Sequence, residues 1–467
     1  MYLLRLSFVW IVLAGGISHA LATEPLEAGV ALVDITPPVP FRMCGYFFER
    51  LSTGTKDPLF ARAVVFQQGN ETAALVFCDL VGVPLDISTA ARKAIHEKAG
   101  IPVANTAITG THTHTGPLYY TVLSDYFHEQ TTAKNGSDPY DIAPYRAMLI
   151  EKLAEAVSQA KASLAPVTLT TGYAIEDRIS FNRRFIMKDG SVGWNPGALN
   201  PNIVRPAGPI DPQVGIVLLS SLGKAERQAA IVSFAMHLDT TGGTLYSADY
   251  VKSLSERLKR EFGPNFKTLF GTGTCGNINH LNVSKQEQRK ASDLGEMLGD
   301  TVAKAIRGDV LSGGREPALA VRSAKVLAPL QKYRPDEIAT AMANMERVGA
   351  RDLAFLETVE ACKIVDIERL KKAGDEVPLE VQVFRLDGDT VIVSLPSEVF
   401  VELGLAIKAA SPFKTTLVVE LANDDVAYIP NKQAFAEGNY EPTNSRVVPG
   451  TGEKLVDAAV GLLKELH

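Results

Sequence analysis

Segments with the apolar pattern of buried β-strands alternate with segments spaced like amphipathic α-helices along almost the whole chain. The strand-like runs are residues 29–35, 61–67, 72–79, 105–109, 167–173, 214–220, 229–235, 268–270, 319–327, 379–385, 390–395 and 415–421. The helical patterns are residues 87–98, 143–164, 248–262, 285–306, 335–372, 399–410 and 453–466. Because the two kinds of segment interleave throughout, they predict an α/β fold with a layered, mixed β-sheet and flanking helices.

Some segments depart from this regular alternation. Residues 335–372 are charged and helical, and we expect them to form a hairpin or lobe on the core. Residues 119–139 and 180–212 are long, polar and rich in Gly, Pro and Asn, and we expect them to be loops. Loops of that length inside a compact domain usually carry function.

The first residues have the pattern of a secretory signal peptide. Arg5 supplies a basic start, residues 6–17 form an apolar run, and Ala20-Leu21-Ala22 is a small-x-small cleavage site. The run is too short to span a membrane, and no later stretch reaches about 20 apolar residues. No cysteine follows the run, so a lipoprotein anchor is not supported. We expect residues 1–22 to be removed and residues 23–467 to form one exported domain, secreted or periplasmic.

Charge and cysteine content exclude several classes of protein. The net charge is −6 and basic residues form no clusters, which argues against a nucleic-acid partner. The four cysteines are far apart and form no CxxC pair, which excludes a zinc ribbon. In an oxidising compartment Cys44, Cys78, Cys275 and Cys362 could form one or two disulfides, and the sequence leaves their pairing open.

Residues 110–117, with the sequence GTHTHTGP, place two histidines at the end of an apolar run. If the segment is extended, side chains two positions apart point to the same face, so His112 and His114 project together. Only eight histidines occur in 467 residues, so the pair stands out. Such a pair is typical of either a polar strand end or a metal ligand beside a general acid or base.

Three further strand-like runs end close to side chains that bind metals or carry protons. Residues 229–235 lead to His237, residues 390–395 lead to Glu398, and residues 415–421 lead to Tyr428. In α/β sheets, ligands bind beyond the carboxyl ends of the strands. If these strands are neighbours that run in one direction, all four groups meet in one cleft.

The residues at these strand ends fit a catalytic zinc site. Such a site needs about three protein ligands from His, Asp or Glu and an open position for water. His112, His237 and Glu398 meet that need. The ion would lower the pKa of bound water and polarise a carbonyl group. Each residue also has an ordinary alternative role, as a hydrogen-bonded histidine, a glutamate at a helix start or a buried tyrosine with a bonded hydroxyl.

Other catalytic motifs are missing or lack their structural context. Residues 271–276 match G-x-G-x-x-G, but the following residues do not form a helical pattern and no βαβ unit surrounds them. Dinucleotide binding is therefore disfavoured, because that motif needs its helix to hold the pyrophosphate. The sequence contains no G-x-S-x-G and no H-E-x-x-H, the usual signatures of serine hydrolases and many metalloproteases.

The chain resembles the neutral/alkaline, non-lysosomal ceramidase family along nearly the whole mature sequence. Residues 110–117 are similar to that family's GTHTHSGP segment. Tyr428 and Tyr440, twelve residues apart, match a pair of tyrosines with the same spacing. Weaker similarities are found at residues 33–37, 45–46, 61–63, 234–237, 247–249 and 395–398.

This resemblance implies a zinc amidase that cleaves the N-acyl bond of a sphingoid lipid. It implies four metal ligands, namely His112, His237, Glu398 and Tyr428. It also implies that His114 moves a proton or polarises the carbonyl group, and that Tyr440 and Arg183 line the substrate site. General chemistry agrees, because an imidazole can pass a proton to a leaving amine and a hydroxyl or guanidinium can hold an oxyanion.

The chain departs from that family at the substrate site. Residues 276–280 (GNINH) replace the family's G-D-x-S-P element, so Asn279 occupies the position of its functional serine. We assign substrate contacts to Asn279, to Asn277 and to Tyr119, which follows the Gly-Pro turn closely. The family's full-length members also carry a C-terminal immunoglobulin-like domain, whereas this chain ends after residues 453–466. We therefore expect an N-acyl amide other than ordinary long-chain ceramide as substrate.

Three functions remain open at this level. The first is an exported zinc amidohydrolase for ceramide or a related N-acyl compound. The second is a zinc hydrolase for another ester or for a cell-wall amide, and the third is a non-catalytic binding protein on the same scaffold. The expected partner is a small-molecule or lipid N-acyl substrate, which is compatible with contact at a membrane surface. The sequence indicates no obligatory protein partner.

Overall fold

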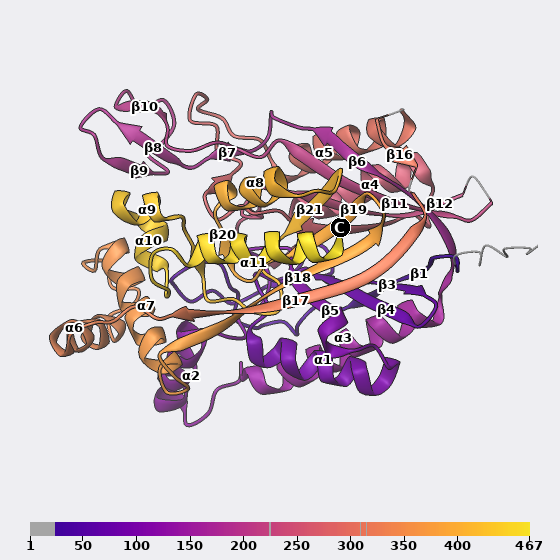
Figure 1. Cartoon of the computed structure of the whole chain (residues 1–467). Coiled ribbons are helices and arrows are strands. Elements are labelled where there is room, and N and C mark those ends of the chain that lie inside the picture. Colours follow the sequence, from indigo (N-terminus) through magenta and orange to yellow (C-terminus); the bar gives the residue numbers. More distant parts are fainter. Residues whose placement is uncertain (1–23, 224–225, 309, 314) are drawn as a thin grey trace, which may run out of the picture.

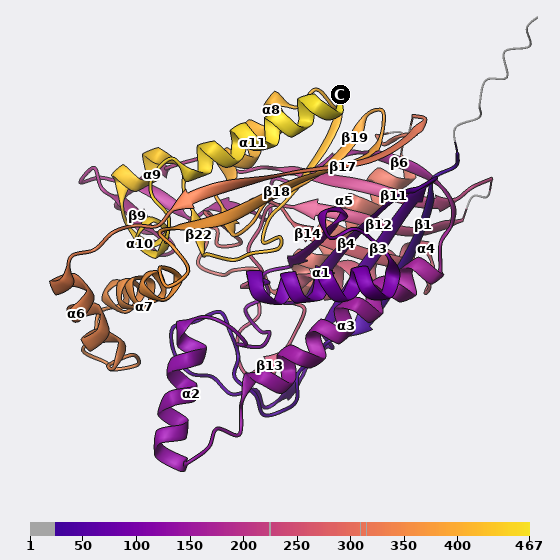
Figure 2. The same ribbon diagram turned by 60° about the horizontal axis from the view of Figure 1, so that its bottom comes forward.

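Two β-sheets pack face to face, and helices cover the outer face of each sheet (Figure 1, Figure 2). The computed structural model describes residues 24–223, 226–308, 310–313 and 315–467, so the predicted signal peptide lies outside the described residues. The chain forms four layers in the order helix, sheet, sheet, helix. The predicted layered α/β fold with flanking helices is confirmed, and its layers contain two mixed sheets.

The larger sheet has the strand order β14-β12-β11-β6-β1-β3-β4-β5, with a short β16 paired to β6. Its strands are β1 (Glu27–Asp34), β3 (Phe60–Gln68), β4 (Glu71–Cys78), β5 (Thr106–Gly110), β6 (Ala165–Ile175), β11 (Gln213–Ser221), β12 (Arg227–Phe234), β14 (Lys267–Thr272) and β16 (Ser312–Gly313). Neighbouring strands are antiparallel except for the parallel pairs β4–β5 and β12–β14.

The smaller sheet has the strand order β17-β18-β19-β21, in which β19 and β21 are parallel. Its strands are β17 (Pro317–Pro329), β18 (Glu376–Asp387), β19 (Thr390–Ser394) and β21 (Thr415–Val419). Between the sheets, Phe77 and Leu269 of the larger sheet pack in one core with Phe384 and Leu417 of the smaller one. Because β4 is covered on both faces, all of residues 73–78 are buried, which explains their unbroken apolar run.

Three pairs of helices complete the outer layers. They are α1 (Leu85–Ala99) with α3 (Ile142–Ala162), α4 (Tyr250–Phe262) with α5 (Ala291–Arg307), and α8 (Val401–Ala410) with α11 (Thr451–Leu466). The first two pairs cover the two halves of the larger sheet, and the third covers the smaller sheet. α4 and α5 approach so closely that a Cβ at Gly295 would lie 2.3 Å from the carbonyl oxygen of Tyr250.

The segments outside the regular alternation form smaller elements beside this core. Residues 335–372 form the predicted hairpin, with α6 (Pro335–Met345) packed on α7 (Phe355–Leu370). Residues 119–139 are not a loop as predicted, because they contain α2 (Val122–Asn135), whose first turns pack in a cluster with Met345 and Cys362. Residues 180–212 contain four short strands, namely β7 (Phe181–Asn182), β8 (Arg184–Met187), β9 (Val192–Trp194) and β10 (Ile203–Pro206).

The remaining elements are short and lie mainly around the carboxyl ends of the strands. They are β2 (Gly54–Thr55), β13 (Leu245–Tyr246), β15 (Ile278–Asn279), β20 (Glu398–Val399), β22 (Tyr428–Ile429), a 3₁₀ turn (Val103–Asn105), α9 (Lys432–Glu437) and α10 (Tyr440–Asn444). Three two-stranded pairs form here: β13 pairs with β2, β15 with β7, and β20 with β22.

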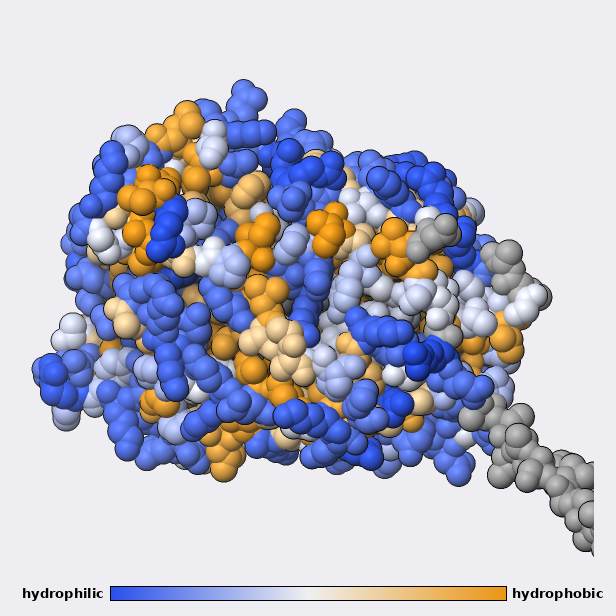
Figure 3. All heavy atoms as spheres, turned by 45° about the horizontal axis from the view of Figure 1, so that its top comes forward, coloured by the Kyte–Doolittle hydropathy of each residue, from blue (hydrophilic) through white to orange (hydrophobic). Residues whose placement is uncertain are grey.

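All four cysteines lie in the described part of the chain, where each is free and buried. The disulfides that an oxidising compartment would permit are therefore not formed. No described helix combines the length and hydrophobicity needed to cross a bilayer. On the face drawn in Figure 3, apolar residues form several separate patches within a mostly hydrophilic surface.

Candidate metal centre

The strand ends that carry the predicted site converge, although their strands are not all neighbours. β5 lies at one edge of the larger sheet and β12 lies near the other edge, which contradicts a simple row of adjacent strands. The smaller sheet contributes the contact that links these distant strand ends. The Gly110 amide at the end of β5 donates to the carbonyl oxygen of Leu421 just beyond β21 (3.1 Å). A β-bridge between Thr113 and Leu238 then joins the loop after β5 to the loop after β12.

His112, His237 and Glu398 form the centre of this convergence. His112 Nε2 and His237 Nε2 each lie 3.2 Å from Glu398 Oε2, and all three side chains are buried. Two ligand atoms bonded to one tetrahedral zinc at about 2.0–2.1 Å lie about 3.3–3.4 Å apart. Each histidine nitrogen therefore already lies at about this spacing from the glutamate oxygen.

The backbone orients both imidazoles for metal binding. His112 Nδ1 donates to the carbonyl oxygen of Val81 (2.7 Å), and His237 Nδ1 donates to that of Cys275 (2.9 Å). A carbonyl oxygen only accepts, so the hydrogen of each neutral ring is on Nδ1 and the lone pair is on Nε2. Histidine ligands of metals usually have such a partner on the second nitrogen, which fixes the tautomer and the ring orientation.

The charges within this group also fit a bound cation. Burial lowers the pKa of His112, but the Glu398 carboxylate outweighs burial and raises that pKa to about 9, so without a metal this ring carries at pH 7 the positive charge that a bound ion would replace. Burial raises the pKa of Glu398, but His112 and His237 outweigh it and hold the pKa well below its usual range. Glu398 Oε2 lacks a well-aligned hydrogen bond within the described chain. A buried, ionised oxygen with no hydrogen bond of its own is costly, and a metal ion would remove that cost.

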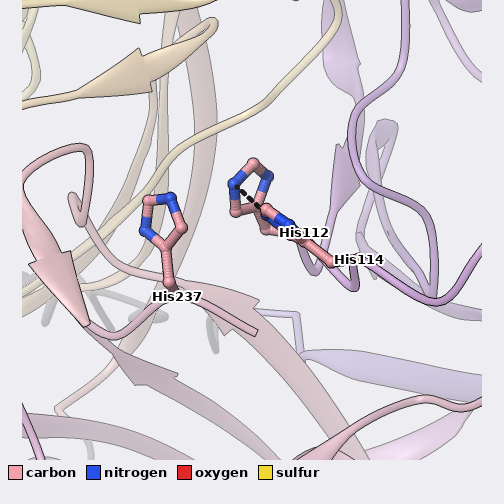
Figure 4. Close-up of side chains that lie close together, drawn as sticks. All are labelled: His112, His114 and His237. Atoms are coloured by element: carbon pink, nitrogen blue, oxygen red, sulfur yellow. Dashed lines mark hydrogen bonds between the residues drawn. The ribbon is translucent and has the colours of Figure 1, made fainter. Parts of the chain in front are cut away.

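His114 lies beside these three atoms but is held differently (Figure 4). Its Nε2 is 3.3 Å from His112 Nε2, and the donor atoms of His112, His114 and His237 lie within 4.8 Å of one another. However, His114 Nδ1 has no hydrogen-bond partner among the described residues, because Asp239 Oδ1 is 3.7 Å away and accepts from the Tyr46 hydroxyl. Burial lowers the pKa of His114 to about 4, so the ring is neutral at pH 7.

The two histidines of the 110–117 segment converge without the extended backbone that the i, i+2 spacing assumes. β5 ends at Gly110, and His112 has a positive φ of 73°. Ser397 and Ala427, each next to a candidate ligand, also have positive φ, at 66° and 61°. Residues other than glycine avoid this region, and such strain is often concentrated at functional sites.

Tyr428 and Tyr440 form the wall next to Glu398. Tyr428 is paired with Glu398 in the register of β20–β22, which places the phenol next to the carboxylate. The rings of Tyr428 and Tyr440 lie 5.4 Å apart. Burial and the nearby Glu398 carboxylate raise the pKa of both hydroxyl groups, so both tyrosines are neutral hydrogen-bond donors at pH 7.

Arg183 lies against both tyrosines and His237. Its guanidinium carbon is 5.4 Å from the ring centre of Tyr428, and Nη1 donates to His237 Nε2 at 3.1 Å. A metal ion would use the same lone pair of His237, so Arg183 would give up this bond when a metal binds. The guanidinium would keep its bonds to Glu441 Oε1 (2.8 Å) and to the Gly276 carbonyl oxygen (2.6 Å).

Two cavities meet at this centre and share His114, Tyr428 and Tyr440. The larger has a volume of about 540 Å³ and also contacts Arg183 and His237. The smaller has a volume of about 140 Å³ and also contacts His112 and Glu398. A substrate bond placed over the candidate ligands would therefore have room on two sides.

Solved structures with this architecture are ceramidases. Over 95% of this chain and 75% of the other, the chain superposes on neutral ceramidase from Pseudomonas aeruginosa with a TM-score of 0.69 and 20% sequence identity. The chain has the neutral ceramidase fold. A structure of a ceramidase complexed with C2 gives the same TM-score of 0.69 at 19% identity, over 95% of this chain and 76% of that one. No protein-family model and no curated protein sequence matches the chain.

Of the three predicted substrate contacts, only Asn279 lines one of the two cavities at the candidate centre. Asn279 lines the larger cavity, where its Nδ2 donates to Asn195 Oδ1 (2.9 Å) and its Oδ1 accepts from the Leu281 amide (3.0 Å). Both ends of the Asn279 side chain are therefore already bonded within the protein.

Asn277 and Tyr119 line neither cavity. The Asn277 side chain accepts from the Val401 amide and donates to Glu402, so it bonds the start of α8. Tyr119 is fully buried and donates its hydroxyl to the carbonyl oxygen of Gly82 (2.6 Å), while its neighbour Tyr120 lines the smaller cavity. Both side chains therefore lie outside the two cavities at the candidate centre, and their contact with a substrate stays a prediction.

Glu420 holds the backbone beside two candidate metal ligands and was missed in the sequence analysis. Its Oε2 accepts from the Val399 amide (2.6 Å), next to Glu398, and its Oε1 accepts from the amide and thiol of Cys275 (both 3.1 Å). Cys275 in turn holds His237 through its carbonyl oxygen. The sequence did contain one signal, a single carboxylate at the end of an apolar strand. Because a buried carboxylate usually has specific partners, this position could have indicated a supporting role.

We expect Glu420→Gln to lower the free energy of unfolding by about 1–3 kcal/mol, because one amide NH₂ would face hydrogen-bond donors. Zinc affinity should also fall by about 10- to 100-fold, the usual effect of losing a group that orients metal ligands. Chemical denaturation and zinc titration measure the two effects. The matched control is Glu256→Gln on the exposed face of α4, which should change stability by less than about 0.5 kcal/mol. Equal behaviour of the two variants would contradict the supporting role of Glu420.

Proposed function

We propose that this chain is a zinc-dependent amidohydrolase of the neutral ceramidase type, which hydrolyses an N-acyl amide bond. The observation that carries the proposal is the 3.2 Å spacing of His112 Nε2 and His237 Nε2 from Glu398 Oε2, in a buried group whose imidazoles are oriented by carbonyl oxygens. The ceramidase fold of the chain supports the same assignment.

In this proposal His112, His237 and Glu398 hold the ion, and Tyr428 is a weaker fourth ligand next to Glu398. When bound, zinc would lower the pKa of water and polarise the substrate carbonyl. His114 is neutral and has no partner on Nδ1, so it can take a proton from the attacking water and pass it to the leaving amine.

Arg183 and Tyr440 would stabilise the transition state. Both line the larger cavity next to His114, and both carry hydrogen-bond donors. Negative charge develops on the carbonyl oxygen when water attacks an amide, and fixed donors in a buried site stabilise that charge strongly. The ion pair between Arg183 and the buried Glu441 holds the guanidinium in place for this role.

An N-acyl lipid is the substrate class that the neighbours favour, because they are ceramidases and one is complexed with C2. The signal-like start of the sequence supports export, which would bring such an enzyme to lipids outside the cytoplasm. A pure binding protein is disfavoured, because it has no need of three ligand atoms at metal spacing. A zinc hydrolase for an ester or a cell-wall amide remains the second candidate.

The test is a hydrolysis screen of N-acyl amides and matched esters, with and without a chelator. We expect amide hydrolysis that is lost with the chelator and restored by added zinc. Hydrolysis that survives complete removal of metal would overturn the proposal. Ligand binding without hydrolysis by a zinc-loaded protein would favour the binding protein, and hydrolysis of esters alone would favour the second candidate.

A further inference from the structure

The two cavities at the metal centre differ greatly in size, about 540 Å³ against about 140 Å³. An apolar cavity of about 150 Å³ is just large enough for benzene, so the smaller cavity has room for about six non-hydrogen atoms. A long alkyl chain exceeds that room several-fold. The size of the smaller cavity therefore limits what can lie on one side of the scissile bond.

The smaller cavity has both apolar and charged residues in its wall. Its apolar walls include Leu118, Val122, Leu123 and Cys362. It also contacts Asp366 and Arg446, a buried ion pair with an Nε–Oδ2 distance of 3.0 Å. An alkyl chain that continued past the apolar walls would press on this pair and remove its remaining water without any new hydrogen bond. Burying charged groups in that way is costly, so the ion pair disfavours a long alkyl chain in this cavity.

Tight packing keeps the smaller cavity from widening. Leu123 and Phe127 of α2 belong to one core cluster with Met345 and Cys362 of the α6–α7 hairpin. In Figure 1 and Figure 2, α2 lies beside that hairpin at the same end of the molecule. Opening the cavity would separate these packed side chains, and lost core packing costs free energy in proportion to the volume created.

The larger cavity has more aromatic rings in its wall. Phe48, Trp194 and Phe355 line this cavity and not the smaller one, whereas Phe47 and Tyr440 line both. Trp194 stacks on Phe355 with ring centres 5.5 Å apart, and its ring lies 4.4 Å from that of Tyr440. Aromatic walls of this kind bury large apolar groups favourably, and the volume of this cavity suits a long chain.

We propose that this chain selects amides with one short arm of about six non-hydrogen atoms and one long apolar arm. The short arm lies between the metal centre and the Asp366–Arg446 pair, and the long arm lies against the aromatic wall. The inference rests on the proposed function and adds the shape of the substrate. It excludes efficient cleavage of ceramides that carry long chains on both sides of the amide.

Two series of simple N-acyl alkylamines test the inference with the zinc-loaded enzyme. One series lengthens the acyl chain on dodecylamine, and the other lengthens the amine on a dodecanoyl group. In one series, kcat/KM should fall at least about 100-fold as the varied arm grows beyond about six atoms, because the extra atoms have no room. In the other series the fixed arm is too long for the smaller cavity. There, kcat/KM should be low for every member whose varied arm is also too long to bind in that cavity.

The outcomes separate this inference from the proposed function. Equal kcat/KM values for short and long arms in both series would overturn the inference and leave the amidohydrolase assignment intact. Failure to hydrolyse any member of either series, by protein with full zinc occupancy, would overturn both.

Variants of the cavity walls provide a second measurement. Leu123→Ala removes about three carbon atoms from the smaller cavity wall, so the length limit should rise by about three atoms. Cys362→Met adds about two atoms to the same wall and should lower the limit by about two, which keeps the test decisive if one variant fails to fold. Leu353→Ala in the larger cavity is the matched control and should leave the limit of the short arm unchanged. If neither smaller-cavity variant changes the length limit of the short arm, the inference is contradicted.

Discussion

Replacing His237 by alanine is expected to abolish zinc retention and, with it, hydrolysis. The site has His112, His237 and Glu398 as its strongest candidate ligands, so the variant loses a third of that set. The remaining pair would hold zinc too weakly to survive dialysis. Metal analysis of the dialysed protein and the rate of amide hydrolysis measure the two losses.

Thermal unfolding gives an independent readout of the same loss. A ligand that binds only the folded state stabilises it by about 2.7 kcal/mol at a concentration of 100 times its Kd. Added zinc should therefore raise the Tm of the wild-type protein and leave the Tm of His237→Ala unchanged. This comparison does not depend on finding the right substrate.

The matched control is His96→Ala in α1. His96 Nδ1 also hydrogen-bonds a backbone carbonyl oxygen, that of Ile101 at 3.1 Å, but the ring has no candidate metal ligand beside it. This variant should keep zinc and activity. Full zinc occupancy in His237→Ala would show that His237 is not a ligand.

The strands were predicted well because this fold buries most of them on both faces. β4, β12 and β21 each have the other sheet on one face and helices on the opposite face. Their sequences are therefore continuous apolar runs. The pairing of the strands was not predictable in the same way. Periodicity reports whether a strand is buried and not which strand lies beside it, so β5 and β12 were expected together although five strands stand between them in the sheet order.

α2 was predicted as a loop because its pattern is weak. Only residues near its start, such as Leu123 and Phe127, are buried, while most of its second half is exposed. An amphipathic stripe is the main helix signal, and a helix that packs through one end lacks most of that stripe.

At the site, the sequence predicted the residues that follow strand ends and missed contacts that depend on the exact path of a loop. His112, His114, His237 and Glu398 lie together because each follows a strand whose carboxyl end faces the same region. Tyr119 and Tyr120 are adjacent, yet only Tyr120 lines a cavity, and no local pattern distinguishes the two. Glu420 is bonded to residues 21 and 145 positions away, so its support of the ligands is visible only in the folded chain.

The second large effect is expected from His114→Ala, which should keep zinc and lower turnover by about 10²–10⁴-fold, the usual range for a positioned general acid or base. His114 lies 3.3 Å from His112 but has no carbonyl partner on Nδ1, unlike the two histidines assigned as ligands.

Comparing the loss of kcat with the loss of zinc occupancy in each variant distinguishes proton transfer from metal binding. With zinc occupancy measured on the same samples, His114→Ala should lose kcat at full occupancy, whereas His112→Ala should lose occupancy and kcat together. The hydrogen bond from His112 Nδ1 to the Val81 carbonyl oxygen explains this difference, because it leaves the Nε2 lone pair of His112 available to a metal ion. His114 Nδ1 has no partner among the described residues, which leaves that ring able to exchange protons. Loss of zinc in His114→Ala together with its retention in His112→Ala would mean that the two neighbouring histidines have the opposite roles.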